Sequence, residues 1–281
     1  NNSTTLSNQS YVVEVSSHPV WYAIQAMPYI IENNHPCASE LANRIYVNSL
    51  SNHIMGQHPE IEAVFKQWQT LDKDALLSNL QKNEALKNAI LEETPWVMDA
   101  LNESQQKQNI ARLFDKNTVN ADLANSVTSL KNLQMPDGSF SWLPGSRSDE
   151  YITTYIIEVF GRMKKANIKN GDGFINSSLT FVDNSIQNKY IKLQEWYKKQ
   201  NLKLEDYMPG NYEVYQLFVR SYYNDVAVSD GSDTAYKFYY NQAIKNWNKY
   251  DLFTQALLGS YDLRKGGNAY KLIEKSIIEK S

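Results

Sequence analysis

The feature that most constrains the fold is a helical repeat of apolar residues, which runs from about residue 18 to the end of the chain. Pro19 is suited to the first turn of a helix, and beyond it apolar side chains recur every three or four residues. The segments that this spacing predicts as the strongest helices are Leu41–Ile54, Ile61–Trp68, Asn120–Leu133, Asp149–Met163, Ser185–Gln200, Tyr212–Tyr223, Asp233–Trp247, Asp251–Leu263 and Ala269–Ile278. Most are apolar around more than one narrow stripe, which suits helices packed on two sides, as in layered or toroidal arrays. We therefore predict an all-α protein.

Residues 1–17 depart from the helical pattern. Asn1–Gln9 is polar, whereas Tyr11–Val15 alternates apolar and polar residues as a short strand does. Because a lone strand is unstable by itself, it either lies on the helical body or belongs to a preceding β domain. We expect residues 1–17 to be a tail and strand from such a domain, and residues 18–281 to form one helical domain. The lack of an initiator Met and of a signal peptide indicates an excised piece or a processed chain.

One loop between the predicted helices stands out. Asn167–Phe174 and Val228–Ser232 read as ordinary Gly/Asp/Asn turns, but Gln134–Gly145 is long and carries two large aromatic residues. Exposed loops seldom hold such side chains. We therefore expect the rings of Phe140 and Trp142 to pack inward.

Charge and cysteine content exclude several classes of protein. The net charge is −3, and Lys and Arg are scattered among Asp and Glu, so no basic stripe indicates a nucleic-acid partner. No window approaches the roughly 18 uninterrupted apolar residues of a membrane span. The single cysteine, Cys37, can form neither an internal disulfide nor a CxxC motif. By itself it is typical of a buried, inert thiol.

Several segments together carry a resemblance to a known family: His18–Glu32 followed by Cys37, Arg44 and Tyr46, then Asn83–Ala100, Asn102–Phe114, Leu133–Trp142, Ser148–Phe160, and the later helices Tyr212–Tyr223 and Tyr236–Leu263. They resemble the thioester-containing domain of bacterial α2-macroglobulins, and most closely the long forms of Bacteroidetes. The resemblance covers nearly the whole chain from about Tyr11. It implies an α/α toroid, in which helical hairpins form inner and outer rings as in terpenoid cyclases and prenyltransferases. Because the family's domain continues further, we expect the helical array to be incomplete at its C-terminus.

A second similarity supports this fold without bearing on function. Gln134–Phe140 reads Q-x-x-x-G-x-F, which is similar to the Q-x-x-x-G-x-W repeat that ties hairpins together in terpenoid cyclases. Gly138 can adopt a turn conformation closed to other residues, and Phe140 can bury its ring against helix ends. An ordinary loop with buried aromatic residues would read the same way.

The resemblance places Cys37 at the position of a reactive thioester. In active members of the family, a Cys-x-Glu-Gln sequence condenses its cysteine with its glutamine and releases ammonia. Here the segment Cys37–Glu40 reads Cys-Ala-Ser-Glu, and Arg44 fixes the register so that Glu40 stands at the glutamine position and Ser39 at the glutamate position. A carboxylate offers no good leaving group and corresponds to the hydrolysed product. We therefore expect the thioester position to be degenerate, near the packed loop residues Gly138, Phe140 and Trp142.

The histidines offer no replacement for the missing chemistry. Some members of the family use a histidine after the D-G-x-F segment, but all four histidines of this chain, His18, His35, His53 and His58, precede it. His35 could activate the Cys37 thiol as a base, although a loop histidine next to a packed thiol is the favoured interpretation.

Other toroidal chemistries also lack their signatures. Zinc prenyltransferases need Asp, Cys and His ligands, but no histidine follows His58 and no cysteine follows Cys37. The Asp-x-Asp-Asp and Asp-Asp-x-x-Asp motifs of terpenoid cyclases do not occur. A metal site could also be sought at His53, His58 and Glu60. Their spacing spans a predicted helix end and contains no H-E-x-x-H motif, so a surface loop is the favoured interpretation. We therefore expect no catalytic residue, no metal and no cofactor.

Our leading hypothesis is a non-catalytic domain of a bacterial α2-macroglobulin-like protease inhibitor that lacks a functional thioester. The resemblance implies proteases as partners of the full-length protein, contacts with other domains of the same chain, and a periplasmic or outer-membrane-associated location. Toroidal glycosidases and lyases have no fixed motif, so an α/α-toroid carbohydrate-active enzyme or glycan-binding module stays open as the alternative. A scaffold for another partner is a third, weaker hypothesis. For the aromatic run Tyr236–Tyr240, core packing is the favoured interpretation. For the acidic pair Asp149 and Glu150, the favoured interpretation is that both residues stabilise the N-terminus of their helix through its dipole.

Overall fold

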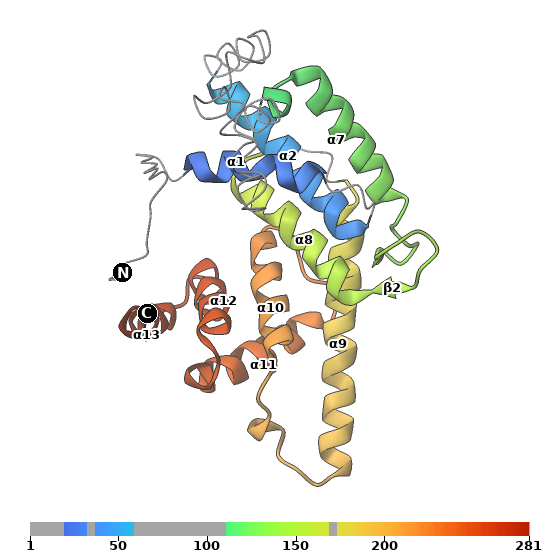
Figure 1. Cartoon of the computed structure of the whole chain (residues 1–281). Coiled ribbons are helices and arrows are strands. Elements are labelled where there is room, and N and C mark those ends of the chain that lie inside the picture. The colour runs from blue at the N-terminus through green and yellow to red at the C-terminus, as the bar shows by residue number, and fades with distance from the viewer. Residues whose placement is uncertain (1–19, 33–36, 59–110, 169–172, 281) are drawn as a thin grey trace, which may run out of the picture.

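The computed structural model describes residues 20–32, 37–58, 111–168 and 173–280, and this part of the chain is mostly helical (Figure 1). Its α-helices are α1 (Val20–Glu32), α2 (Ala38–Gln57), α7 (Lys116–Lys131), α8 (Glu150–Lys165), α9 (Ile175–Lys199), α10 (Asn211–Arg220), α11 (Ser232–Lys245), α12 (Leu252–Arg264) and α13 (Tyr270–Lys280). Short 3-10 turns cover Leu204–Asp206, Ser221–Tyr223 and Trp247–Lys249, and two-residue strands β1 (Phe140–Ser141) and β2 (Ser148–Asp149) pair antiparallel. The all-α prediction is confirmed for these residues.

Most helix boundaries agree with the sequence pattern. The main difference is α9, which begins at Ile175 rather than Ser185. Its first turns bury Leu179, Val182 and Ile186 at helical spacing, so the repeat extends further towards the N-terminus than expected. The predicted strand Tyr11–Val15 and the predicted helix Ile61–Trp68 lie outside the described residues.

The helices pack as a chain of neighbouring pairs. α2 packs against α7, and α8 packs against α2, α9 and α10. Farther along the chain, α11 packs against α9 and α10, and α12 packs against α10 and α13. The C-terminal half of α9 extends beyond its neighbours (Figure 1), and its buried residues all lie between Ile175 and Ile186.

The main core lies where α2, α7, α8, α9 and α10 meet. Fully buried aliphatic side chains from these helices include Ile45, Leu130, Ile156, Leu179 and Val214. Helices that bury residues on several sides, as α8 does, need apolar side chains around most of their circumference. This explains the wide stripes in the sequence.

A buried ion pair joins α9 to α10. The Arg220 guanidinium donates from Nε to Asp183 Oδ1 at 2.9 Å, and both side chains are almost completely buried. Tyr236 donates its hydroxyl hydrogen to the same Asp183 oxygen at 2.8 Å. The aromatic run that contains Tyr236 buries Tyr236 and Tyr239 in the core, as the favoured interpretation predicted.

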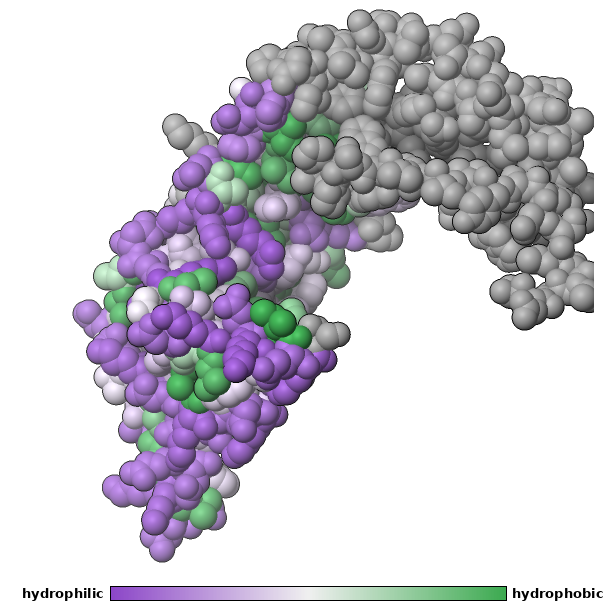
Figure 2. All heavy atoms as spheres, turned by 90° about the vertical axis from the view of Figure 1, so that its left-hand side faces the viewer, coloured by the Kyte–Doolittle hydropathy of each residue, from purple (hydrophilic) through white to green (hydrophobic). Residues whose placement is uncertain are grey.

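The face that carries α12 and α13 is mainly polar, with scattered apolar patches (Figure 2). Phe253, Leu272 and Ile278 are among its exposed apolar residues. Among the described residues, none of the helices is both long enough and apolar enough to cross a membrane.

The loop between α7 and β1 is tied to the beginning of α9 by hydrogen bonds from the side chains of Gln134 and Ser178. The Gln134 side chain donates from Nε2 towards the carbonyl oxygen of Phe174 at 3.1 Å and the hydroxyl oxygen of Ser178 at 3.0 Å. Ser178 in turn donates to the carbonyl oxygen of Gly138 at 2.7 Å. Gly138 has φ +88°, and a Cβ at this position would lie 2.3 Å from the Ser177 carbonyl oxygen. The Q-x-x-x-G-x-F segment therefore joins two helices, and its glycine is required by both conformation and space.

Candidate functional site

Cys37 lies at the beginning of α2. Its backbone is extended, with φ −85° and ψ 158°, and it occupies the N-cap position. The thiol is half-buried, and Sγ lies 3.3 Å from Ser39 Oγ. The next backbone amide, that of Ala38, donates to the Trp142 carbonyl oxygen at 2.9 Å. One of the unpaired N–H groups at the start of the helix is therefore satisfied by the Gln134–Gly145 loop.

Glu40 lies in the first turn of the same helix, three residues after Cys37. In the family that the sequence resembles, the cysteine and the glutamine of the thioester motif have this same spacing. Glu40 Oε2 is buried and has no hydrogen-bond partner among the described residues. The structure thus places a thiol and a carboxylate at one helix N-terminus, but a carboxylate cannot release ammonia.

The loop residues Gly138, Phe140 and Trp142 have different surroundings. Phe140 is fully buried and packs edge-on against Phe174, with ring centroids 5.9 Å apart, so its predicted inward packing is confirmed. The same prediction for Trp142 is wrong, because the side chain is 38% exposed. Its ring lies nearly parallel to that of Tyr151, at 6.4 Å between centroids and 14° between planes. Trp142 therefore contacts α2 through its backbone and the surface of α8 through its ring.

The histidines do not gather around Cys37 in the described part of the chain. His18 and His35 lie outside the described residues, so the Cys37–His35 pair stays a prediction. His53 lies within α2, and His58 is at its C-cap, at the far end of the helix from Cys37. Among the residues that the structure describes, no three His, Cys, Asp or Glu side chains are arranged to hold a metal ion.

The predicted role of Asp149 and Glu150 at a helix N-terminus is confirmed. Asp149 is the N-cap of α8 and accepts a hydrogen bond from the Ile152 backbone N–H at 2.9 Å. Glu150 is in the first helical turn, where it pairs with Lys189 at 2.7 Å and accepts from Gln216 Nε2 at 2.6 Å.

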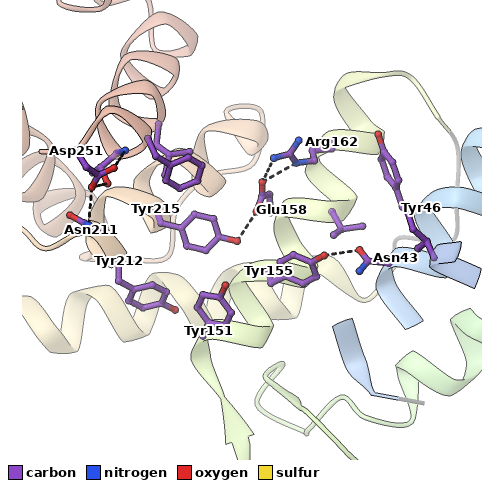
Figure 3. Close-up of a pocket in the computed structure, with 15 residues that line it drawn as sticks. Asn43, Tyr46, Tyr151, Tyr155, Glu158, Arg162, Asn211, Tyr212, Tyr215 and Asp251 are labelled. Carbon is purple, nitrogen blue, oxygen red and sulfur yellow. Dashed lines mark hydrogen bonds and ion pairs between the residues drawn. The ribbon is translucent and has the colours of Figure 1, made fainter. Parts of the chain in front are cut away.

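A cavity of about 780 Å³ lies between α8, α10 and α12, with α1 and α2 on one side (Figure 3). It was not anticipated from the sequence. Its lining combines five tyrosines with two carboxylates, two asparagines, an arginine and several apolar side chains. The tyrosines are Tyr46, Tyr151, Tyr155, Tyr212 and Tyr215.

Three of these tyrosines form a continuous aromatic surface, which we call the tyrosine platform: Tyr151, Tyr212 and Tyr215. Each pair has ring centroids 6.0 to 6.2 Å apart, and the ring planes are inclined to each other by only 33° to 39°. Tyr151 is 51% exposed, and Lys189 Nζ lies 4.7 Å from the Tyr212 ring centroid. The shallow angles make the platform an open cup and not a closed box.

Glu158 lies beside this platform with both carboxylate oxygens engaged. Arg162 donates from Nε and Nη2 to Oε1 at 2.8 and 2.5 Å, and the Tyr215 hydroxyl donates to Oε2 at 2.6 Å (Figure 3). Burial raises the pKa of the Tyr215 phenol well above its ordinary value, and the Glu158 charge raises it further. Tyr215 therefore stays a hydrogen-bond donor at neutral pH.

Asp251, the second carboxylate of the cavity, is also engaged. It is the N-cap of α12, and its Oδ1 accepts from the Thr254 backbone N–H at 2.9 Å. Its Oδ2 accepts from Thr254 Oγ1 at 2.8 Å and from Asn211 Nδ2 at 3.1 Å. Hydrogen bonds from the Thr254 backbone and side chain lower the pKa of Asp251. Both oxygens of Glu158 and of Asp251 therefore already accept hydrogen bonds from neighbouring side chains or backbone.

The sequence did contain a signal for this cavity. One face of α8 carries four of the lining residues at helical spacing: Tyr151, Tyr155, Glu158 and Arg162. Helical spacing alone does not distinguish a tyrosine stripe that lines a cavity from one that fills a core. Comparison with known proteins adds no identification: the chain matches no protein-family model, no curated protein and no solved structure.

Proposed function

We propose that this chain is the thioester-type domain of a bacterial α2-macroglobulin-like protease inhibitor, and that it works without a thioester. The observation that carries the proposal is the place of Cys37. Its helix begins directly against the Gln134–Gly145 loop, through the hydrogen bond from Ala38 N–H to the Trp142 carbonyl oxygen. Two of the segments that carry the family resemblance, the one around Cys37 and Leu133–Trp142, are thus in contact beside the position where the resemblance expects the reactive bond.

The α/α toroid is part of the same proposal. Its support is the way in which Gln134 ties the end of α7 to the beginning of α9, as the Q-x-x-x-G-x-W repeat does between hairpins of terpenoid cyclases. The sequential packing of α8 on α9, and of α10 on both α8 and α11, is in keeping with an array of hairpins.

The absence of covalent chemistry follows from Glu40. A thioester forms from a glutamine because ammonia departs as the thiol attacks the carboxamide. Glu40 would have to release hydroxide or water, and Cys37 has no activated acyl group to attack. The domain would therefore contribute a rigid body and binding surfaces to a protein that traps proteases by a change of conformation. Proteases and the other domains of the same protein would be its partners, and the periplasm or outer membrane its location.

An α/α-toroid carbohydrate-active enzyme is the alternative that the cavity brings forward. Its two carboxylates, Glu158 and Asp251, already accept hydrogen bonds on both oxygens. A glycosidase needs one carboxyl group that donates a proton and a second that attacks the sugar or activates water. This arrangement favours a cavity without hydrolytic chemistry.

The proposal is tested by incubating the full protein that carries this chain with chymotrypsin, and then separating the products on native and denaturing gels. We expect a complex on native gels and no covalent adduct on denaturing gels. Failure to form any complex would contradict the inhibitor function. An adduct that disappears in a Cys37→Ala variant would instead show a working thioester.

A further inference from the structure

We infer that the cavity beside α8 and α10 is a binding site for a neutral oligosaccharide, with the tyrosine platform as its floor. The site is separate from the Cys37 position and does not depend on the proposed inhibitor function. Its size suits the inference, since small-molecule sites are concave and measure roughly 300 to 1,000 Å³, and this cavity measures about 780 Å³.

The shape of the platform favours a flat, partly apolar ligand. Pyranose rings present a face of C–H groups, which packs well on an aromatic face, while their hydroxyl groups point outward from the ring edge. The shallow angles between the rings of Tyr151, Tyr212 and Tyr215 leave a wide surface for such a face. A site for a quaternary ammonium group would instead need rings that enclose the cation from several sides.

Polar groups at the edge of the cavity can bind sugar hydroxyl groups. Asn43 uses its Oδ1 to accept from the Tyr155 hydroxyl at 2.6 Å, which leaves its NH2 group as a donor. Arg162 uses Nε and Nη2 for Glu158, and Nη1 makes no hydrogen bond with any described residue. The Tyr151 hydroxyl likewise has no hydrogen-bond partner in the described part of the chain. These fixed donors, next to apolar ring faces, are the combination that a sugar needs.

The charges of the cavity favour a neutral ligand. Arg162 and Glu158 neutralise each other, and the hydrogen bonds that lower the pKa of Asp251 keep it negative at neutral pH. No uncompensated cation among the lining residues is available to attract an anionic sugar, and Asp251 would repel one. The electrostatic balance therefore excludes uronic acid polymers as the preferred ligands.

The test is calorimetric titration of the protein with five neutral hexasaccharides: cellohexaose, xylohexaose, mannohexaose, maltohexaose and chitohexaose. At least one should bind with a dissociation constant between about 1 µM and 1 mM. Hexagalacturonate and choline, titrated in the same way, should bind at least about tenfold more weakly. Absence of binding by all five neutral sugars, or tighter binding of choline or hexagalacturonate, would overturn the inference.

Variants locate the site. Tyr151→Ala removes an exposed ring of the platform and should weaken binding about tenfold, which corresponds to about 1.4 kcal/mol and is the size of effect expected for loss of one aromatic contact. Tyr151→Phe keeps the ring and should retain most of the affinity. Trp196→Ala is the matched control, since it removes an exposed ring from the far half of α9 and should leave binding unchanged. Equal binding by Tyr151→Ala and the unaltered protein, with both folded by circular dichroism, would place the sugar elsewhere and refute the assignment.

Discussion

Replacement of Gly138 by alanine is expected to destabilise the protein strongly, because two separate effects act at this position. The backbone of Gly138 has φ +88°, a conformation that costs other residues roughly 1–2 kcal/mol. A Cβ would also lie 2.3 Å from the Ser177 carbonyl oxygen, which is a backbone atom of α9 and cannot rotate away. The loop and the beginning of α9 would have to separate.

That separation would weaken the hydrogen bonds that join the loop to α9. Ser178 donates to the Gly138 carbonyl oxygen at 2.7 Å, and Gln134 donates to the Phe174 carbonyl oxygen at 3.1 Å. Each such bond contributes about 0.5–1.5 kcal/mol. Loss of both, added to the conformational cost, gives a decrease of about 2–5 kcal/mol in the free energy of unfolding.

Gly145→Ala is the matched control for this substitution. Gly145 also has a positive φ, +76°, but a Cβ there would meet no atom within 4 Å. It should therefore lose only the roughly 1–2 kcal/mol of conformational cost. Urea denaturation followed by far-ultraviolet circular dichroism measures both variants, and the m-value should stay constant. If Gly138→Ala is no more destabilising than Gly145→Ala, the account of the loop contact is refuted.

Three further predictions concern stability. Asp183→Asn removes the charge partner of buried Arg220 and should cost about 3–5 kcal/mol in urea denaturation; a cost below about 1 kcal/mol would contradict the buried pair. Asp149→Ala removes the hydrogen bond to the Ile152 backbone N–H and should cost about 1 kcal/mol by the same assay, whereas an unchanged midpoint would argue against the cap. Burial raises the pKa of Tyr207 from 10.0 to about 12, so the folded state retains a proton that the unfolded chain releases. Stability should therefore hold below about pH 10 and decrease as the pH rises to about 12, and a urea midpoint that does not fall across this range would count against the buried tyrosines.

Much of the fold follows from the sequence, because helical periodicity reports directly on burial. The buried residues Ile152, Ile156, Val159 and Met163 are those that the apolar repeat of α8 predicts. The early beginning of α9 was missed because polar residues interrupt its first turns, although Ser178 among them is fully buried. Its burial depends on hydrogen bonds to a loop 40 residues away in sequence, which no local pattern reveals.

The cavity shows the same limit more clearly. Each of the two helices carries a pair of tyrosines with the spacing of a buried stripe: Tyr151 and Tyr155 on α8, and Tyr212 and Tyr215 on α10. Whether two such stripes close on each other or leave a space depends on the distance between the helices, which is set by residues elsewhere. The orientation of Trp142 was mispredicted for a related reason. Its ring finds an aromatic partner on the surface of α8, so a large loop aromatic need not be buried.

The most direct test of the central claim, that Cys37 and Glu40 form no thioester, is intact-mass spectrometry with thiol titration before and after methylamine treatment. We predict one titratable thiol per chain without treatment, an intact mass equal to that of the sequence, and no change in either with methylamine. Gain of one methylamine with release of a previously masked thiol would show that a thioester exists, and would contradict the account of this site.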